Sequence, residues 1–215
     1  MEDKHTGKNT FLRKFTILFF SIHAICNPGK EMIKKAGNFK ILDTLAEGVK
    51  YNAYRAVNNE NSSVVLKIVD NAAQNRKTIQ QLKKEFNLLK SIASAHVIKA
   101  LDFLEADNKA ILVLEDIFGT TLKNYLQAHT PITNKKQLKN ALKIVRAIAL
   151  GLSDIHRQQI THYDINVKNI IYNPSTGTLK LIDFSLAENN TLENKSEEKD
   201  FVSGTFAYIS PEQTG

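Results

Sequence analysis

Hydrophobic and polar positions beyond residue 38 follow first the short period of strands and then the longer period of helices. Short apolar runs bounded by turn residues predict strands in the first part of the chain. These runs are Phe39–Leu45, Ala53–Val57, Val64–Val69, Leu101–Glu105 and Ala110–Glu115. Between the third and fourth runs, apolar residues at 79, 82, 86, 89 and 92 predict a helix over Thr78–Ile92 with one buried face.

The pattern becomes mainly helical after residue 120. A short helix is predicted over Leu122–Ala128 and a long one over Lys136–Arg157, which is apolar at 138, 142, 145, 148, 152 and 155. Ile170–Tyr172 and Leu179–Ile182 then predict a hairpin around a turn at residues 173–177. This order predicts an α+β fold, in which a strand-rich part precedes a helical part.

Residues 1–37 do not continue this pattern, and we treat them as a separate N-terminal extension. Phe15–Cys26 is apolar and follows Arg13 and Lys14. Its twelve residues are too few to cross a bilayer, which needs about 20. A basic start before a short apolar run is compatible with a signal peptide, with a helix on a membrane surface, or with an extension that has no part in the fold. All three alternatives stay open.

Composition narrows the class of protein. The chain has 215 residues, of which 42% are hydrophobic and 24% charged, as in one globular domain. Its single cysteine, Cys26, excludes a disulfide framework and a cysteine zinc site, and it favours the reducing cytoplasm. The net charge of +7 is uneven, since residues 1–38 hold seven Lys or Arg and three Asp or Glu. Because the folded part shows no basic stripe, we expect it to bind neither nucleic acid nor a membrane.

Several side chains that can act in catalysis or bind a metal are close together at residues 162–169, which read His-Tyr-Asp-Ile-Asn-Val-Lys-Asn. Fourteen residues after Asn169 comes Asp-Phe-Ser, which begins at Asp183. This pair of motifs resembles the catalytic loop H-x-D-x-x-x-x-N and the D-F-G element of protein kinases. The resemblance implies that Asp164 is the catalytic base and that Asn169 and Asp183 bind Mg²⁺ through oxygen ligands.

Two charged residues upstream fit the same family. Residues 64–67 resemble the strand V-A-I-K, whose lysine contacts the nucleotide phosphates, and Glu85 follows Lys67 by 18 residues on the predicted helix. The resemblance assigns Lys67 and Glu85 to the catalytic machinery as an ion pair. A buried lysine without a partner is costly, so the contact is expected on physical grounds as well.

The resemblance also places ATP between the strand-rich and the helical part. Residues 114–117 occupy the place of the segment whose backbone binds adenine, and Ala53 and Ile171 would enclose the base. The expected contacts with the nucleotide and its metal are Leu45, Gly48, Ala53, Lys67, Glu115, Ile117, Ile171, Asn169 and Asp183.

The expected substrate is a protein. Residues 204–212, Gly-Thr-Phe-Ala-Tyr-Ile-Ser-Pro-Glu, are similar to the end of the activation segment in serine/threonine kinases. Small-molecule phosphotransferases, a second enzyme class to consider, share the catalytic loop but lack this segment. The phrases at 171–180 and 207–215 resemble the N-terminal kinase domain of bacterial sensor proteins that continue into an ATPase module and a histidine kinase. Adjoining domains of that kind are therefore expected partners.

Several positions depart from the family pattern. Residues 46–53 correspond to the loop G-x-G-x-x-G-x-V, but Ala46 and Tyr51 replace two of its three glycines. Asn166 replaces a lysine that helps to hold the γ-phosphate, and Tyr163 replaces an arginine that anchors a phosphorylated activation loop. A pseudokinase, which would sense nucleotide or bind partners without catalysis, is therefore the alternative to an active enzyme.

The resemblance as a whole implies a two-lobed α+β kinase fold, with a strand-rich lobe at 38–117 and an incomplete helical lobe at 118–215. Kinases continue beyond the Pro-Glu at 211–212 into several helices, so we expect this chain to be a fragment or the product of a truncated gene. The expected activity is the transfer of the γ-phosphate of ATP, with Mg²⁺, to a serine or threonine of a cytoplasmic protein.

Overall fold

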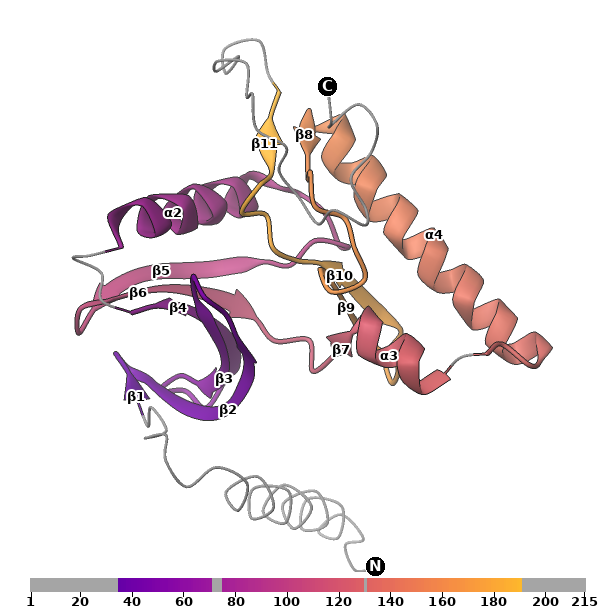
Figure 1. Ribbon diagram of the computed structural model, residues 1–215, viewed down its shortest axis with the longest axis horizontal. Helices are drawn as coiled ribbons and strands as arrows, with labels where there is room; N and C mark the ends of the chain where they lie inside the picture. Colours follow the sequence, from indigo (N-terminus) through magenta and orange to yellow (C-terminus); the bar gives the residue numbers. More distant parts are fainter. Residues whose placement is uncertain (1–34, 71–74, 130, 191–215) are drawn as a thin grey trace, which may run out of the picture. The chain divides into compact units, whose positions relative to one another are not determined.

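The computed structural model describes residues 35–70, 75–129 and 131–190 (Figure 1). The apolar run at 15–26 and the motif at 204–212 lie outside these residues, so the interpretations that rest on them stay predictions. In the described part of the chain, no helix is both long enough and apolar enough to cross a membrane.

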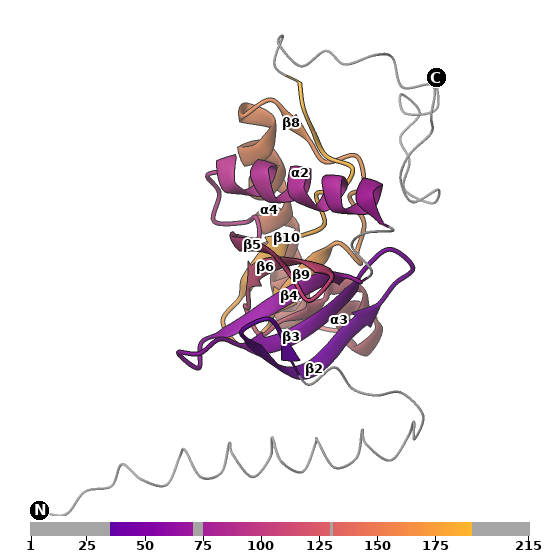
Figure 2. The same cartoon turned by 90° about the vertical axis from the view of Figure 1, so that its left-hand side faces the viewer.

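A six-stranded antiparallel sheet forms the first lobe, in the order β1-β2-β3-β4-β6-β5 (Figures 1 and 2). The strands are β1 (Lys35–Ala36), β2 (Phe39–Glu47), β3 (Asn52–Val57), β4 (Ser63–Val69), β5 (Ala100–Ala106) and β6 (Lys109–Glu115). Helix α2 (Arg76–Ser91) follows β4 in the chain and packs against β5 and β6.

The core of this lobe lies between the central strands and α2. Every residue of β6 from Ala110 to Leu114 is buried, and α2 packs against this strand, which lies between β4 and β5 in the sheet. Helix α2 buries Leu82, Glu85 and Leu89, which recur at helical spacing on one face. Glu85 is the charged member of that buried face, so it needs a partner from the sheet or from the second lobe.

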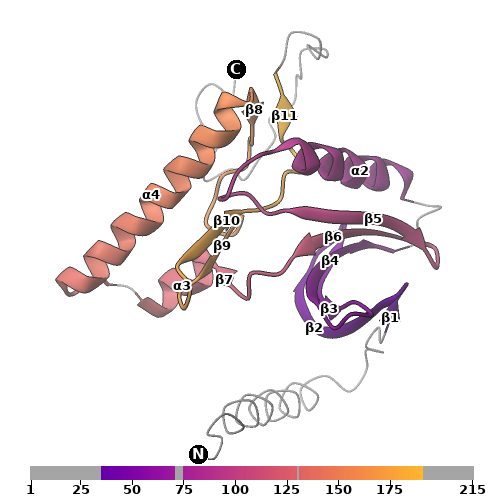
Figure 3. The same cartoon turned by 180° about the vertical axis from the view of Figure 1, so that it is seen from behind.

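The second lobe combines two helices with short strands (Figure 3). Its elements are β7 (Thr120–Thr121), α3 (Leu122–His129), α4 (Lys135–Arg157), β8 (Ile160–Thr161), β9 (Ile170–Asn173), β10 (Thr178–Leu181) and β11 (Glu188–Asn189). Strands β10, β9 and β7 form one small sheet, and β8 pairs with β11. Helix α4 begins after Asn134, whose side chain accepts a hydrogen bond from the Gln137 N–H, and packs against β8 and β10.

The expected strands and helices are all present, and their ends differ from the predicted ones by at most two residues. The sequence prediction missed β1, β7, β8 and β11, which have two residues each and are too short to show a periodic pattern. Strand β1 begins at Lys35, so the sheet extends into the segment that we assigned to the N-terminal extension.

Helix α4 differs in part from the expectation of one buried apolar stripe. Its buried positions are Ile144, Gly151 and Ile155, because this face meets β8 and β10. Leu138 and Leu142, which belong to the predicted stripe, are 49% and 61% exposed in the described part of the chain. The first half of the helix therefore carries apolar surface that the described residues do not cover.

Candidate active site

Lys67 lies at the centre of a buried network of charges. Its Nζ is 2.7 Å from Oε2 and 3.0 Å from Oε1 of Glu85, and it is 3.0 Å from Oδ1 of Asp183. The three side chains come from β4, from α2 and from the segment that follows β10. Lys67 and Glu85 are only 5% and 3% exposed, so the contact that the sequence predicts is present and enclosed.

Neighbouring charges outweigh burial at Lys67 and Asp183, whereas burial raises the pKa of Glu85 in spite of the charge of Lys67. Burial alone would lower the pKa of Lys67, but the carboxylates of Glu85 and Asp183 outweigh it and hold that pKa above its usual value. Burial alone would raise the pKa of Asp183, but the charge of Lys67 and the hydrogen bonds from Tyr51 and Lys67 lower it to about 2. Lys67 is therefore a cation and Asp183 an anion at neutral pH.

Phe184 connects this network to the second lobe. Its backbone N–H donates to Oε1 of Glu85 at 3.2 Å, and its ring packs edge-on against His162 with 4.5 Å between the ring centroids. Nε2 of His162 lies 3.0 Å from the carbonyl oxygen of Ile182. Because burial lowers the pKa of His162, its imidazole is neutral, and it packs against the ring of Phe184.

A second polar cluster surrounds Asp164. The amide nitrogen of Asn169 donates to Oδ2 of Asp164 at 2.7 Å, and that of Asn166 donates to Oδ1 at 3.1 Å. Oδ1 of Asn166 accepts the backbone N–H of Lys168 at 2.8 Å. Both oxygens of the Asp164 carboxylate are therefore oriented by side chains of its own loop.

The backbone is unusual at both motifs. Tyr163 and Asp183 have φ angles of 62° and 61°, in the left-handed region that side-chain-bearing residues rarely adopt. Such conformations cost free energy and collect at functional sites, where the surrounding contacts enforce them. Here Tyr163 directly precedes Asp164, and Asp183 is the residue whose carboxylate contacts Lys67.

The residues expected around adenine lie on three elements. Ala53 of β3 pairs with Lys67 of β4, so their side chains share one face of the sheet. Ile171 lies on β9, and its Cγ2 comes so close to Gly119 that a Cβ there would be 2.5 Å away. The chain that follows β6 can thus pass Ile171 only with glycine at 119.

Leu45 and Gly48 lie at the end of β2 and in the turn beyond it. The register of β2 against β3 shifts between Thr44 and Ala46, which leaves Leu45 in an irregular position, 41% exposed. The N–H of Gly48 donates to Oδ1 of Asn52 at 3.2 Å and closes the turn. The structure therefore places Ala53 beside Lys67, whereas Leu45 and Gly48 lie towards the exposed end of the hairpin.

The segment after β6 is held by side chains that the sequence prediction did not include. Oε1 of Glu115 is 2.8 Å from Nζ of Lys180, which is buried. The carbonyl oxygen of Ile117 accepts the side-chain amide of Asn173 at 2.8 Å. Lys180 and Asn173 flank the turn between β9 and β10, so this hairpin positions the predicted adenine-binding segment.

Asp116 provides another contact of the same kind. Its carboxylate accepts hydrogen bonds from Nε of Arg55 at 2.6 Å, from the hydroxyl of Ser63 at 2.8 Å and from the N–H of Phe118 at 2.8 Å. Burial alone would raise the pKa of Asp116, but these hydrogen bonds and the charge of Arg55 lower it. No sequence motif predicts this cluster, because its side chains come from residues 55, 63 and 116, which lie on β3, on β4 and after β6.

The donor atoms near Lys67 fit a magnesium ion bound together with phosphate. Among the described residues, no group of three or more His, Cys, Asp or Glu could hold a metal by itself. Asp183 offers an ionised carboxylate, and Asn169 offers an amide oxygen, since its amide nitrogen donates to Asp164. Hard oxygen ligands of this kind suit Mg²⁺, which usually takes one or two carboxylates and completes its shell with water and phosphate.

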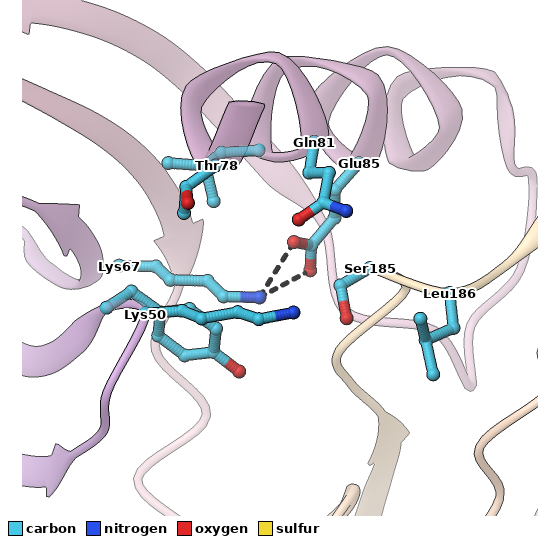
Figure 4. A pocket seen from close by; sticks show the side chains of 9 residues that line it. Lys50, Lys67, Thr78, Gln81, Glu85, Ser185 and Leu186 are labelled. Carbon is cyan, nitrogen blue, oxygen red and sulfur yellow. Dashed lines mark hydrogen bonds and ion pairs between the residues drawn. The ribbon is translucent and has the colours of Figure 1, made fainter. Parts of the chain in front are cut away.

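A pocket opens beside this network (Figure 4). The side chains of Lys67 and Glu85 point towards each other at its centre, and Thr78 and Gln81 approach from α2. Lys50 and Tyr51, from the turn between β2 and β3, also line it. Sequence reasoning treated Tyr51 as a missing glycine, but its hydroxyl donates to Oδ2 of Asp183 at 2.7 Å.

Comparison with known proteins agrees with this arrangement. Residues 39–215 match the family model described as protein kinase domain. Similar proteins include the probable serine/threonine-protein kinase pknA2 of Bifidobacterium longum, 26% identical over 191 residues, which are 86% of this chain and 24% of that protein. Serine/threonine-protein kinase PrkC of Bacillus subtilis is 28% identical over 183 residues, which are 83% of this chain and 27% of that protein.

A third similar protein is the probable serine/threonine-protein kinase PknB of Lactococcus lactis, 24% identical over 181 residues, which are 83% of this chain and 28% of that protein. The chain thus spans about a quarter of the length of these bacterial relatives. With the family model matched over 177 residues and both lobes in place, the chain belongs to the protein kinase domain family and has its two-lobed fold.

Proposed function

We propose that this domain transfers the γ-phosphate of ATP to a serine or threonine hydroxyl of a protein. The observation that carries the proposal is the buried contact of Lys67 with Glu85 and Asp183. Burying three charges costs free energy that a merely structural core would avoid, so their retention favours a role in binding a charged ligand. The names of the bacterial relatives support a serine or threonine acceptor.

The network supplies the contacts that a nucleotide triphosphate needs. Lys67 contacts the phosphates as a cation, and Glu85 holds its ammonium in position. Asp183 and Asn169 bind Mg²⁺, which neutralises charge on the phosphates when it is bound. The backbone of Glu115 and Ile117 binds the adenine.

Apolar side chains complete the nucleotide site. Ala53 lies on the same sheet face as Lys67, and Leu45 and Gly48 precede it on the hairpin. Ile171 approaches from the second lobe. These residues enclose the adenine and the ribose from the two lobes.

Asp164 acts on the hydroxyl that receives the phosphate. Its carboxylate is oriented by the amides of Asn166 and Asn169, so one conformation is favoured before substrate binds. In this conformation it orients the hydroxyl and accepts its proton as the bond from the hydroxyl oxygen to the γ-phosphorus forms and the bond from that phosphorus to the oxygen of the departing ADP breaks. The loop therefore contributes positioning more than charge, since no cation stands at 166.

The alternative is a pseudokinase that binds nucleotide without transferring phosphate. Asn166 favours it, because the family pattern has a lysine at this position that helps to hold the γ-phosphate. Both proposals share the nucleotide site and differ only in the transfer step.

Transfer of a radiolabelled γ-phosphate tests the proposal. The chain is incubated with Mg²⁺, labelled ATP and dephosphorylated casein, and label on casein and on the chain is counted. We expect the Asp164→Asn variant to lose transfer by about 100-fold or more while it binds Mg–ATP as before. Asp102→Asn, which alters an exposed aspartate on β5, is the matched control and should change nothing.

Two outcomes decide between the alternatives. Equal transfer by the wild type and by Asp164→Asn would exclude Asp164 as the base. Binding of Mg–ATP by the wild type without any transfer would favour the pseudokinase.

The wider setting stays a prediction. The cytoplasmic location rests on the single cysteine and on the use of ATP. Adjoining sensor or ATPase domains would belong to a longer protein, and the resemblance of residues 171–180 supports them. Mass spectrometry of the native protein would give its length and thereby test for such domains.

A further inference from the structure

Tyr51 contacts both Lys67 and Asp183, the two groups to which the proposed function assigns the phosphates and the metal. Its hydroxyl donates to Oδ2 of Asp183 at 2.7 Å. Its ring lies over the ammonium of Lys67, with Nζ 4.0 Å from the ring centroid. Of the neighbouring residues of this turn, Val49 faces solvent, whereas Lys50 is exposed and also lines the pocket beside Tyr51 (Figure 4).

These contacts enclose the side chain of Lys67, which is 6% exposed, and cover most of that of Asp183, which is 21% exposed. Nζ of Lys67 has Glu85 and Asp183 as anionic partners and the Tyr51 ring over it as a further contact. The carboxylate of Asp183 has Lys67 on one oxygen and Tyr51 on the other. A phosphate at Lys67 and a metal at Asp183 would both have to displace the Tyr51 side chain.

We propose that Tyr51 is an internal competitor of the nucleotide, which closes the phosphate site of the free domain and has to leave before Mg–ATP binds. The inference rests on the proposed function, because it takes the ligand of Lys67 and Asp183 to be Mg–ATP. Closure lowers the population of the domain that can bind, and the apparent affinity falls by the same factor. Tyr51 therefore sets the concentration of nucleotide at which the site fills, and it takes no part in the phosphate transfer itself.

This role differs from that of the glycine it replaces in the family pattern. Glycine at 51 would lack a side chain and could not reach Asp183. A tyrosine supplies a hydrogen bond to an anion and an aromatic face to a cation, two interactions that are strong when enclosed. The competitor therefore also stabilises the free domain, by satisfying charges that burial would otherwise penalise.

Two measurements on the same variants test the inference, and they should change in opposite directions. Tyr51→Phe removes the bond to Asp183 but keeps the ring, and Tyr51→Ser removes both contacts. Urea unfolding without ligand should show reduced stability for both variants. Calorimetric titration with Mg–ADP and Mg–ATP should show tighter binding, by about tenfold for Tyr51→Phe, since a hydrogen bond to a charged group corresponds to a factor of this order, and by more for Tyr51→Ser.

Tyr125→Phe is the matched control. Its hydroxyl accepts a hydrogen bond from Asn140 at 2.9 Å, on α3 and far along the chain from the network. This variant should lose stability and bind nucleotide like the wild type.

The outcomes separate the inference from the proposed function. Unchanged or weaker nucleotide binding by both Tyr51 variants, with a wild type that binds, would overturn the competitor role and leave the proposed function intact. If neither the wild type nor any Tyr51 variant binds Mg–ADP or Mg–ATP, the proposed function fails and the inference fails with it.

Discussion

Two groups of polar side chains carry the kinase motifs of this domain, and they are held in place in different ways. Lys67 meets Glu85 and Asp183 across sequence separations of 18 and 116 residues. Asp164 meets Asn166 and Asn169 within one loop of six residues. Lys67 and Glu85 meet within the first lobe, and Asp183 joins them only when the second lobe packs against it, whereas the group around Asp164 is assembled by local turns.

The two groups differ in the free energy that their burial costs. The long-range group consists of full charges in a nearly closed setting, so each member depends on the others. The loop group orients one carboxylate with neutral amides, and its hydrogen bonds resemble those of an ordinary turn. We therefore expect substitutions in the first group to affect stability and binding, and substitutions at Asp164 and Asn166 to affect transfer, whereas Asn169 also counts among the expected metal ligands.

Removal of the central cation should give the largest effect. Lys67→Met leaves the carboxylates of Glu85 and Asp183 without their cation, and breaking a buried pair from one side costs about 3–5 kcal/mol. Urea unfolding at neutral pH measures this loss. Lys83→Met, on the exposed face of α2, is the control and should stay within about 0.5 kcal/mol of the wild type. Equal losses in both variants would mean that the network does not stabilise the fold.

The metal ligands should differ in their contribution to nucleotide binding. A carboxylate brings charge to Mg²⁺, whereas an amide brings only a dipole. In thermal unfolding with Mg–ATP, the stabilisation by ligand should vanish for Asp183→Asn and only shrink for Asn169→Ala. Each variant is compared with its own melting temperature without nucleotide. An equal loss in the two variants would contradict the assignment of Asp183 as the stronger ligand.

Asp116 extends the comparison to a charge pair in the segment that we expect to bind adenine. Its pKa is lowered in the folded state, so its contribution to stability is complete above the ordinary pKa near 3.8 and is lost as the pH falls below it. Asp116→Asn should lower the unfolding free energy by about 1–3 kcal/mol at neutral pH. Urea unfolding repeated towards acid should show the wild type and the variant converging. A gap that stays constant with pH would contradict the charge-based explanation.

Substitution in the catalytic loop should have the smallest effect on the fold. Asn166→Ala removes one amide from Asp164 and leaves the bond from Asn169, so we expect transfer to fall by about tenfold. Mg–ATP affinity should stay within about twofold, because the side chain of Asn166 bonds to Asp164 and to the N–H of Lys168, neither of which is assigned to phosphate or metal. A parallel loss of affinity would show that the loop and the long-range group are coupled.

The sequence predicted the elements and the motif residues because both leave local traces. Periodic apolar positions gave the strands and helices, and spacing within motifs gave Lys67, Glu85, Asp164, Asn169 and Asp183. Contacts such as Arg55 with Asp116 or Glu115 with Lys180 were not predictable, since they depend on register and on the packing of separate strands. The two-residue strands were not predictable either, because they are too short to show a periodic pattern.

At two positions that depart from the family pattern, the structure shows side-chain contacts that the motif comparison does not predict. Asn166 was noted as a missing lysine, yet its side chain orients Asp164 and closes the turn at Lys168. Tyr51 was noted as a missing glycine, yet it contacts both Asp183 and Lys67. A motif comparison registers what is absent at a position, whereas only the packed side chain shows what has taken its place.

A crystal structure of the chain with Mg²⁺ and a non-hydrolysable ATP analogue tests the central claim most directly. We expect the phosphates against Nζ of Lys67, the metal against Asp183 and Asn169, and the side chain of Tyr51 displaced from Asp183. A nucleotide that binds elsewhere, or a metal that does not touch Asp183, would contradict the proposed site.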